Sequence, residues 1–204
     1  MTFHLILLAA GFGSRFGSNK LVASLDGRPV YRHGFDRLTA IRDGALYPSD
    51  VTVVTQYPEI AESVEKDGAL AAINEDPARG QTSSLVTAVR ALSEAGRLKE
   101  DDYLVFFAGD QPFLKRETIE RFLGEIAKKK PLLASFASNG RFRNPGAFST
   151  SLAGEILALT GDSGGREILK AHESEVLLFE SYEPDELRDI DRPEDLRRFS
   201  AGES

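Results

Sequence analysis

In the stretch FHLILLAAGFGSRFGSNK (residues 3–20), a continuous apolar run passes at once into a loop of glycine, serine and basic residues. An apolar run without alternation that ends in glycine is typical of a strand buried on both faces of a parallel sheet. The glycine loop would then lie at the carboxyl end of that strand, where open α/β sheets bind their ligands. This stretch therefore predicts an α/β fold and a binding site at the loop.

The glycines of this loop do not match a dinucleotide-binding motif. Gly11, Gly13 and Gly17 form G-x-G-x-x-x-G instead of G-x-G-x-x-G, and the second predicted strand ends without an acid for a ribose. The G-x-x-x-x-G-K-[ST] pattern of a P-loop is also absent. Backbone amides of a glycine loop, with Arg15 and Lys20 nearby, suit a triphosphate. The simpler alternative is a strand-to-helix turn with solvated basic residues.

Apolar runs and helical periodicity alternate along the rest of the chain. Further strands are predicted at residues 51–55, 103–110, 131–137 and 176–182. Helices are predicted at residues 30–41, 59–72, 85–95, 118–130 and 192–199. This alternation predicts a mostly parallel sheet covered by helices, and the absence of linkers or repeats predicts a single domain over residues 1–204.

Composition narrows the classes of function. The chain has 204 residues, a formal net charge of −7, three histidines and no cysteine. Disulfides, thiolate zinc sites and iron–sulfur ligation are therefore excluded, and any metal is expected to be Mg²⁺ on carboxylates. The negative charge argues against general nucleic-acid binding. Since no apolar run reaches the roughly 18–20 residues of a membrane span, we expect a cytoplasmic protein that binds neither nucleic acid nor membrane.

Acidic residues are predicted near the same edge of the sheet. Asp110, in GDQPF, follows a buried strand and is placed to hold Mg²⁺ beside phosphates, although an aspartate before a proline also forms turns. Asp189 and Asp191, in LRDIDRPEDL, would share one side of an extended segment. Asp191 is also a candidate N-cap of the last helix, and Ser83 or Ser84 a candidate cap of the helix at 85–95.

Six patches in order resemble one family over nearly the whole chain. They are LAAGFGSRFGSNK, LDGRPVYRH, GQTSSL, GDQPFL, GDSGGREIL and DIDRPEDL. Together they resemble the molybdenum cofactor cytidylyltransferases, within the MobA-like nucleotidyltransferases. The resemblance implies a Rossmann-like, three-layer α/β/α nucleotide-diphosphosugar transferase fold.

The resemblance also implies a reaction and a set of site residues. An NTP and the molybdopterin cofactor would give the dinucleotide cofactor and pyrophosphate, and a molybdoenzyme that receives the product is a further implied partner. Arg15 and Lys20 would neutralise the triphosphate, and Asp110 would ligate Mg²⁺ together with Asp189 or Asp191. The implied nucleotide-binding residues are Ala9, Ala10, Gly11, Gly13, Ser14, Arg15, Lys20, Gly80, Ser83 and Ser84.

Two details bear on the substrates. LAAG stands where guanylyl-transferring relatives tend to carry LAGG, which favours CTP over GTP. In RFRNPGAF, Arg143 and Asn144 replace the glycine and histidine that family members often carry before a proline in the acceptor region. We expect these two residues to contact the acceptor, with a solvent-exposed Arg143 as the alternative.

Three other functions remain open from the sequence. The same loop serves guanylyl transfer to the same cofactor. It also serves nucleotidyl transfer to a sugar phosphate or another phosphorylated acceptor, although the P-K-Q of the methylerythritol phosphate branch is missing. A nucleotide sensor or cofactor chaperone would keep the fold and bind CTP without turnover.

Overall fold

The computed structural model of the chain describes residues 1–11, 13, 16–180 and 183–200, and within them the main sheet has the strand order β5-β4-β1-β6-β8-β7-β9. Its strands are β1 (Phe3–Ala9), β4 (Ser49–Thr55), β5 (Leu70–Ile73), β6 (Tyr103–Ala108), β7 (Leu133–Ser138), β8 (Arg141–Ser149) and β9 (Val176–Glu180). Only β8 runs antiparallel to its neighbours in this sheet. The strands β2 (Ser24–Leu25) and β3 (Arg28–Pro29) form a separate short ribbon.

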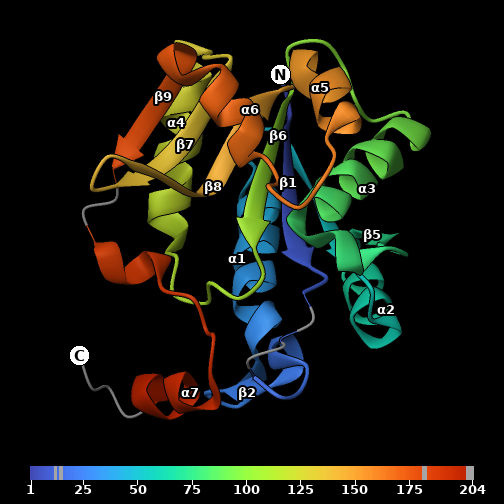
Figure 1. The fold of residues 1–204 in the computed structure, drawn as a ribbon, viewed down its shortest axis with the longest axis vertical. Coiled ribbons are helices and arrows are strands. Elements are labelled where there is room, and N and C mark those ends of the chain that lie inside the picture. Colours follow the sequence, from blue (N-terminus) through green and yellow to red (C-terminus); the bar gives the residue numbers. More distant parts are fainter. Residues whose placement is uncertain (12, 14–15, 181–182, 201–204) are drawn as a thin grey trace.

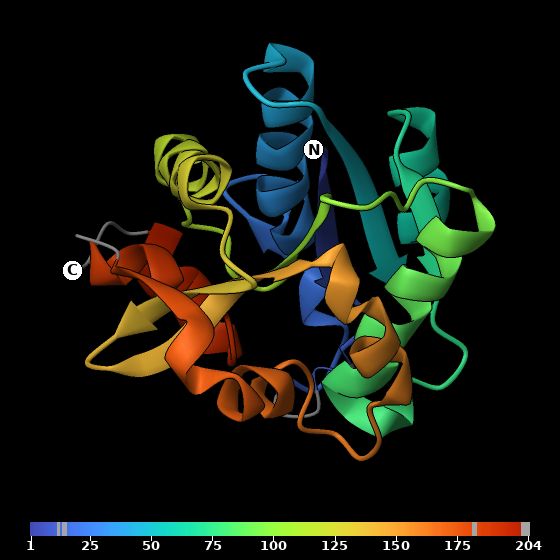
Figure 2. The same ribbon diagram turned by 90° about the horizontal axis from the view of Figure 1, so that it is seen from above.

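Helices cover both faces of the sheet (Figures 1 and 2). They are α1 (Val30–Gly44), α2 (Pro58–Lys66), α3 (Gly80–Glu94), α4 (Arg116–Lys129), α5 (Ala153–Ala158), α6 (Arg166–Ala171) and α7 (Pro193–Ser200). One apolar cluster joins the sheet to α1, α2 and α4, and a second joins its other face to α3, α5 and α6. The predicted three-layer α/β/α fold with a mostly parallel sheet is confirmed.

Strand β1 shows why the opening apolar run has no alternation. Phe3, Leu5 and Leu7 belong to the cluster under α1, α2 and α4, whereas Ile6 belongs to the cluster under α3, α5 and α6. All four side chains are almost fully buried. A strand in the middle of a two-faced sheet needs apolar residues at every position, so the run is continuous.

Two sequence predictions of secondary structure are wrong, and one strand was missed. The helix predicted over residues 59–72 ends at Lys66, because Gly68 has a φ of +76° and the chain then enters β5. Helix α3 begins at Gly80 and not near residue 85, so Ser83 and Ser84 lie inside it and do not cap it. Strand β8 was not predicted at all.

Strands β1 and β6 run side by side and end near the C-terminal segment (Figure 1). That segment returns to this edge of the sheet, where the Ile190 amide donates to the Asp110 carbonyl oxygen at 2.9 Å. Residues from both ends of the chain therefore meet at the predicted site. Within the described residues, the structure contains no helix that is long and apolar enough to span a membrane.

Candidate active site

A cleft of about 1000 Å³ opens at the carboxyl ends of β1 and β6. Its walls come from the glycine loop, the start of α3, strand β8, helix α6 and the C-terminal segment. The sequence-predicted site residues that line it are Ala10, Gly11, Gly80, Ser84, Asp110, Arg143, Asn144, Asp189 and Asp191. The fold thus brings into one cleft most of the residues that the sequence singled out.

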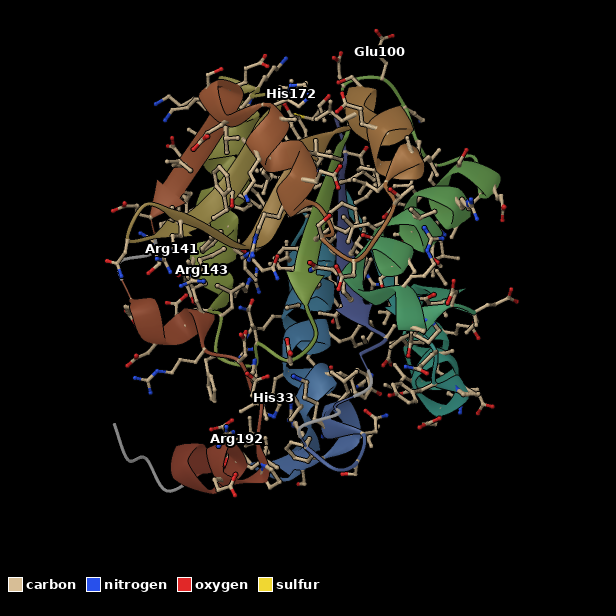
Figure 3. The ribbon with its side chains drawn as sticks, in the orientation of Figure 1. His33, Glu100, Arg141, Arg143, His172 and Arg192 are labelled. Carbon is tan, nitrogen blue, oxygen red and sulfur yellow. The ribbon has the colours of Figure 1, made fainter. Side chains whose placement is uncertain are left out.

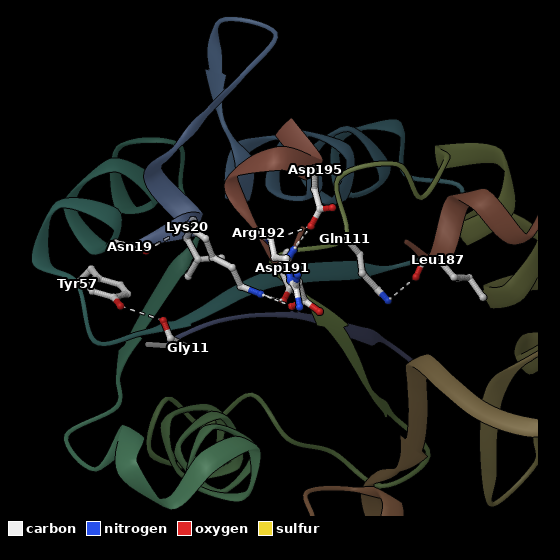
Figure 4. A network of polar contacts seen from close by, with 11 residues as sticks. Gly11, Asn19, Lys20, Tyr57, Gln111, Leu187, Asp191, Arg192 and Asp195 are labelled. Atoms are coloured by element: carbon white, nitrogen blue, oxygen red, sulfur yellow. Dashed lines mark hydrogen bonds and ion pairs between the residues drawn. The ribbon is translucent and has the colours of Figure 1, made fainter. Parts of the chain in front are cut away.

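The Lys20 ammonium group joins two of the predicted metal ligands. Its Nζ donates to Asp110 Oδ2 at 2.6 Å and to Asp191 Oδ1 at 3.2 Å, and the second contact is drawn in Figure 4. Lys20 opens a short 3₁₀ turn (Lys20–Val22), whose Leu21 amide donates to the Asn19 side chain. This turn fixes the direction of the lysine stem, so one cation sits between two carboxylates.

The charges of Asp110 and Asp191 shift the pKa values of Lys20 and Asp189. Burial lowers the pKa of Lys20, but the carboxylates of Asp110 and Asp191 outweigh it and raise the pKa above the usual 10.5. Desolvation raises the pKa of Asp189, and the negative charges of Asp110 and Asp191 raise it further. Three carboxylates therefore lie close enough to repel one another, with Lys20 as their common cation.

Ile190 sets the orientation of the two C-terminal aspartates. Its side chain is 0% exposed and packs with Leu25 and Val30, while Asp189 and Asp191 on either side of it line the cleft. The prediction that these two aspartates share one side of an extended segment is confirmed.

The capping role predicted for Asp191 is wrong. The carboxylate at the start of α7 that accepts backbone hydrogen bonds is Asp195, from the amides of Asp191 at 2.9 Å and Arg192 at 2.8 Å (Figure 4). The Asp191 side chain faces Lys20 instead.

The start of the glycine loop is held from strand β4. Gln56 Nε2 donates to the Ala10 carbonyl oxygen at 2.6 Å, and the Tyr57 hydroxyl donates to the Gly11 carbonyl oxygen at 2.9 Å (Figure 4). The sequence indicates residues 55–57 as a ligand-binding segment by position alone, since they lie at the carboxyl end of a predicted strand, but it assigns no role to Gln56 or Tyr57. Ala9 is buried in β1 and does not line the cleft.

The remaining residues of the loop divide into two groups. Gly13 is described but is not part of the cleft lining. Ser14 and Arg15, which were predicted to bind the nucleotide, lie outside the described residues. Their roles stay predictions.

Helix α3 begins with a residue that must be glycine. Gly80 has a φ of +66°, and a Cβ there would lie 2.8 Å from the Cβ of Asp162. One turn on, Asn74 Nδ2 donates to Ser83 Oγ at 2.9 Å and to Ser84 Oγ at 3.1 Å. Ser84 lines the cleft, whereas Ser83 donates back to the Gly80 carbonyl oxygen and is not part of the lining.

The far wall of the cleft carries basic and amide side chains. Arg143, labelled in Figure 3, and Asn144 lie on β8, and a cis peptide bond joins Asn144 to Pro145. The lining also includes Gln81 and Gln111, which lie in segments that strand-end position indicates, and Arg166 and Arg188, to which the sequence gives no role. Gln81, Gln111 and Arg166 stand inside patches that carry the family resemblance, GQTSSL, GDQPFL and GDSGGREIL, but only the folded chain places them in the cleft.

The carboxylates fit a metal ion that arrives with its substrate. Among the described residues, no group of three or more histidine, aspartate or glutamate side chains forms a ready-made cation site. Mg²⁺ is usually bound by one or two carboxylates together with waters and substrate phosphates. The convergence of Asp110 and Asp191 on one cation meets that requirement, with Asp189 beside them.

Comparison with known proteins supports one family. A family model described as "MobA-like NTP transferase domain" matches residues 5–176. The chain is 28% identical over 199 residues to the purine catabolism protein PucB of Bacillus subtilis, covering 93% of this chain and 92% of that protein. It is 26% identical over 160 residues to 3-deoxy-manno-octulosonate cytidylyltransferase of Elusimicrobium minutum, covering 76% of this chain and 60% of that protein.

The curated cytidylyltransferases are only partly covered by this chain. The matched region spans between 43% and 60% of their length. Among solved structures, the molybdopterin-guanine dinucleotide biosynthesis protein A of Archaeoglobus fulgidus superposes with a TM-score of 0.71 at 19% identity, covering 97% of both chains. A likeness at that identity shows a shared fold.

Proposed function

This chain belongs to the MobA-like NTP transferase family, and we propose that it transfers a cytidylyl group from CTP to the molybdopterin cofactor with the help of Mg²⁺. The observation that carries the proposal is the Lys20 ammonium group between Asp110 and Asp191, two aspartates that line the cleft. A lysine and two or three carboxylates beside a glycine loop supply what a metal-bound triphosphate needs: a cation for its charge and oxygen donors for its metal.

In this proposal, a terminal phosphate oxygen of the acceptor attacks the α-phosphorus of CTP. The bond between the α-phosphorus and the bridging oxygen to the β-phosphorus breaks, and pyrophosphate leaves. Such transfers depend mainly on positioning and on neutralising charge, so no strong base and no covalent intermediate are needed. Bound Mg²⁺ would supply further neutralisation of the phosphate oxygens.

The residues of this chain divide the task between them. Lys20 pairs with the triphosphate and then with the departing pyrophosphate, while Asp110, with Asp189 or Asp191, holds the metal. The loop after β1 presents its backbone amides to the phosphates, and Arg15 adds a second cation to it. Arg143 and Asn144 on the opposite wall receive the acceptor, assisted by Arg166 and Arg188, which line the same cleft.

CTP is favoured over GTP by two observations. The loop carries LAAG, and curated relatives at 26% to 31% identity are named as cytidylyltransferases. Guanylyl transfer to the same cofactor is the alternative, because the Archaeoglobus fulgidus neighbour is titled a molybdopterin-guanine dinucleotide biosynthesis protein.

A second acceptor has support of its own. Several curated relatives are named 3-deoxy-manno-octulosonate cytidylyltransferases, which points to a sugar acid. A carboxylate on such an acceptor would suit the same arginine-bearing wall as a phosphate does.

The test supplies the protein with Mg²⁺, CTP labelled at the α-phosphate, and either molybdopterin cofactor or the sugar acid. We expect pyrophosphate release and label in the dinucleotide product with molybdopterin, and neither with Asp110→Asn. If product forms with the sugar acid and not with molybdopterin, the acceptor is a sugar acid. Absence of product with all four NTPs and both acceptors would contradict transfer, and CTP binding without turnover would identify a sensor or chaperone.

A further inference from the structure

The segment that carries Asp189 and Asp191 lies against the loop that follows β6. We call residues 186–191 the diaspartate segment. At one end, the Ile190 amide donates to the Asp110 carbonyl oxygen at 2.9 Å. In the middle, Gln111 Nε2 donates to the Leu187 carbonyl oxygen at 3.2 Å (Figure 4). The other end is held by Glu186.

Glu186 is a buried acid with a specific set of partners. Its side chain is 5% exposed. Its Oε2 accepts from the Lys115 backbone amide at 3.2 Å, and its Oε1 accepts from Thr118 Oγ1 at 3.1 Å. Buried acids are rare unless they are paired, so this carboxylate has a structural or functional reason to be there.

The N-terminus of α4 explains how the fold tolerates this charge. Lys115 is the N-cap residue of α4, and Thr118 lies in its first turn. The first amides of a helix lack helical partners and carry the positive end of its dipole, which favours an anion there. The Lys115 ammonium group adds a cation 3.8 Å from Oε1. Glu186 therefore joins the diaspartate segment to the start of α4 with two hydrogen bonds and a favourable field.

We propose that Glu186 is a positioning residue that keeps Asp189 and Asp191 in register with Asp110 and Lys20. The inference rests on the proposed function for the role of the aspartates as metal ligands. Glu186 itself does not line the cleft, so it acts through the segment that it anchors. Loss of an outer partner of a metal ligand typically weakens metal affinity about 10- to 100-fold.

Three variants separate the anchor from general stability. Glu186→Ala leaves the Lys115 amide and the Thr118 hydroxyl without their acceptor. Glu186→Gln can keep both hydrogen bonds, because its carbonyl can accept from the Lys115 amide while its amide donates to the Thr118 hydroxyl oxygen. Thr118→Val removes one of the two donors at nearly constant shape, and serves if Glu186→Ala does not fold. The matched control is Glu125→Ala, which removes an exposed acid from α4, the helix to which Glu186 is anchored.

The first measurement is Mn²⁺ binding, by electron paramagnetic resonance, to protein saturated with α,β-methylene CTP. We expect Glu186→Ala to bind Mn²⁺ about 10- to 100-fold more weakly than wild type. Thr118→Val should show a smaller loss, and Glu186→Gln and Glu125→Ala should stay close to wild type. Equal affinity in all variants would overturn the proposal.

The second measurement is hydrogen–deuterium exchange without metal or nucleotide, which does not depend on the proposed function. Faster exchange over residues 186–191 is expected in Glu186→Ala but not in Glu125→Ala. If wild type fails to bind metal and nucleotide, the proposed function fails, and exchange alone decides the anchor. Unchanged exchange in Glu186→Ala would refute the anchor whatever the activity.

Discussion

Lys20 has two carboxylate partners, and a triphosphate would offer it new ones. Its raised pKa keeps the side chain cationic, and the stabilising ion pairs persist below pH 10.5 and are lost only as pH rises through the higher folded-state value. Activity should therefore show no loss near neutral pH that traces to Lys20.

Replacing this cation tests its role directly. Lys20→Met keeps the apolar stem and removes the charge, so the developing negative charge of pyrophosphate loses a donor. We expect kcat for pyrophosphate release to fall about 10²- to 10³-fold. Lys129→Met, which removes an exposed lysine paired with Glu125, should keep wild-type kcat. A Lys20→Met enzyme with wild-type kcat would show that Lys20 only balances the carboxylates.

The ionised Asp189 side chain is expected to lower the free energy of unfolding. Its pKa is raised in the folded chain by desolvation and by Asp110 and Asp191, so the folded state holds this proton more tightly than the unfolded state does. The free energy of unfolding therefore falls as pH rises from near 3.8 through the folded-state pKa, and the ionised side chain is destabilising at all higher pH.

Asp189→Asn should accordingly raise the Tm at pH 7 in EDTA by a small amount, because solvent screens this exposed residue, while lowering the rate of transfer. The gain should shrink as pH is lowered toward 4, where the wild-type carboxylate takes up its proton. Thermal melts across this pH range make the comparison, and Asp185→Asn, an exposed acid paired with Arg188, should give no gain. A lower Tm for Asp189→Asn at pH 7 would contradict the assigned cause.

At the scale of elements, the residues that follow β4 are hydrogen-bonded to the loop that follows β1. The Tyr57 hydroxyl donates to the Gly11 carbonyl oxygen, which keeps this carbonyl turned toward β4. Tyr57→Phe removes a hydrogen bond worth roughly 0.5–1.5 kcal/mol, so the KM for CTP should rise about 2- to 10-fold with little change in kcat. Tyr103→Phe loses an equivalent bond to the Pro131 carbonyl oxygen and should leave KM unchanged. Steady-state kinetics would disprove the role of Tyr57 if both variants matched wild type.

Elements with a strong local pattern could be predicted, and elements that depend on distant partners could not. Strands β1, β4 and β6 are central, so their apolar runs are unmistakable. Strand β5 (Leu70–Ile73) is a short edge strand with two alanines, and its composition equally fits the end of a helix. Strand β8 contains Asn144 and Pro145, which discourage a strand locally, but pairing with β6 and β7 overrides that preference.

The residues of the candidate site also divide into those that the sequence could predict and those that it could not. Asp110, Lys20 and Asp191 could be chosen from the sequence, because each stands in a motif at a strand end or helix start. Glu186 could not be chosen, because one acid among many has no local pattern, and its burial depends on Lys115 and Thr118 about 70 residues earlier. Gln56 and Tyr57 follow a predicted strand, so position at a strand end indicates their segment, whereas their contacts with the glycine loop appear only in the fold.

At the scale of the whole molecule, the site joins the two ends of the chain. Lys20 is 171 residues from Asp191 in sequence, yet its side chain contacts this aspartate, which lines the cleft. The cleft walls also come from elements that belong to both apolar clusters, so a bound nucleotide would contact elements packed on both faces of the sheet. A ligand that binds only the folded state should therefore stabilise the chain as a whole.

A thermal-shift comparison of CTP, GTP, ATP and UTP with Mg²⁺ uses this coupling to identify the base. At a hundredfold excess over Kd, the bound nucleotide stabilises the fold by about 2.7 kcal/mol. For a chain of this size, each kcal/mol raises the Tm by about 2–4 °C, so CTP should raise it by about 5–10 °C. Asp110→Asn should lose most of the Mg²⁺-dependent part of the shift, because the metal that links protein to phosphates loses a ligand. A larger shift with GTP would favour guanylyl transfer, and no shift with any nucleotide would contradict a triphosphate site in this cleft.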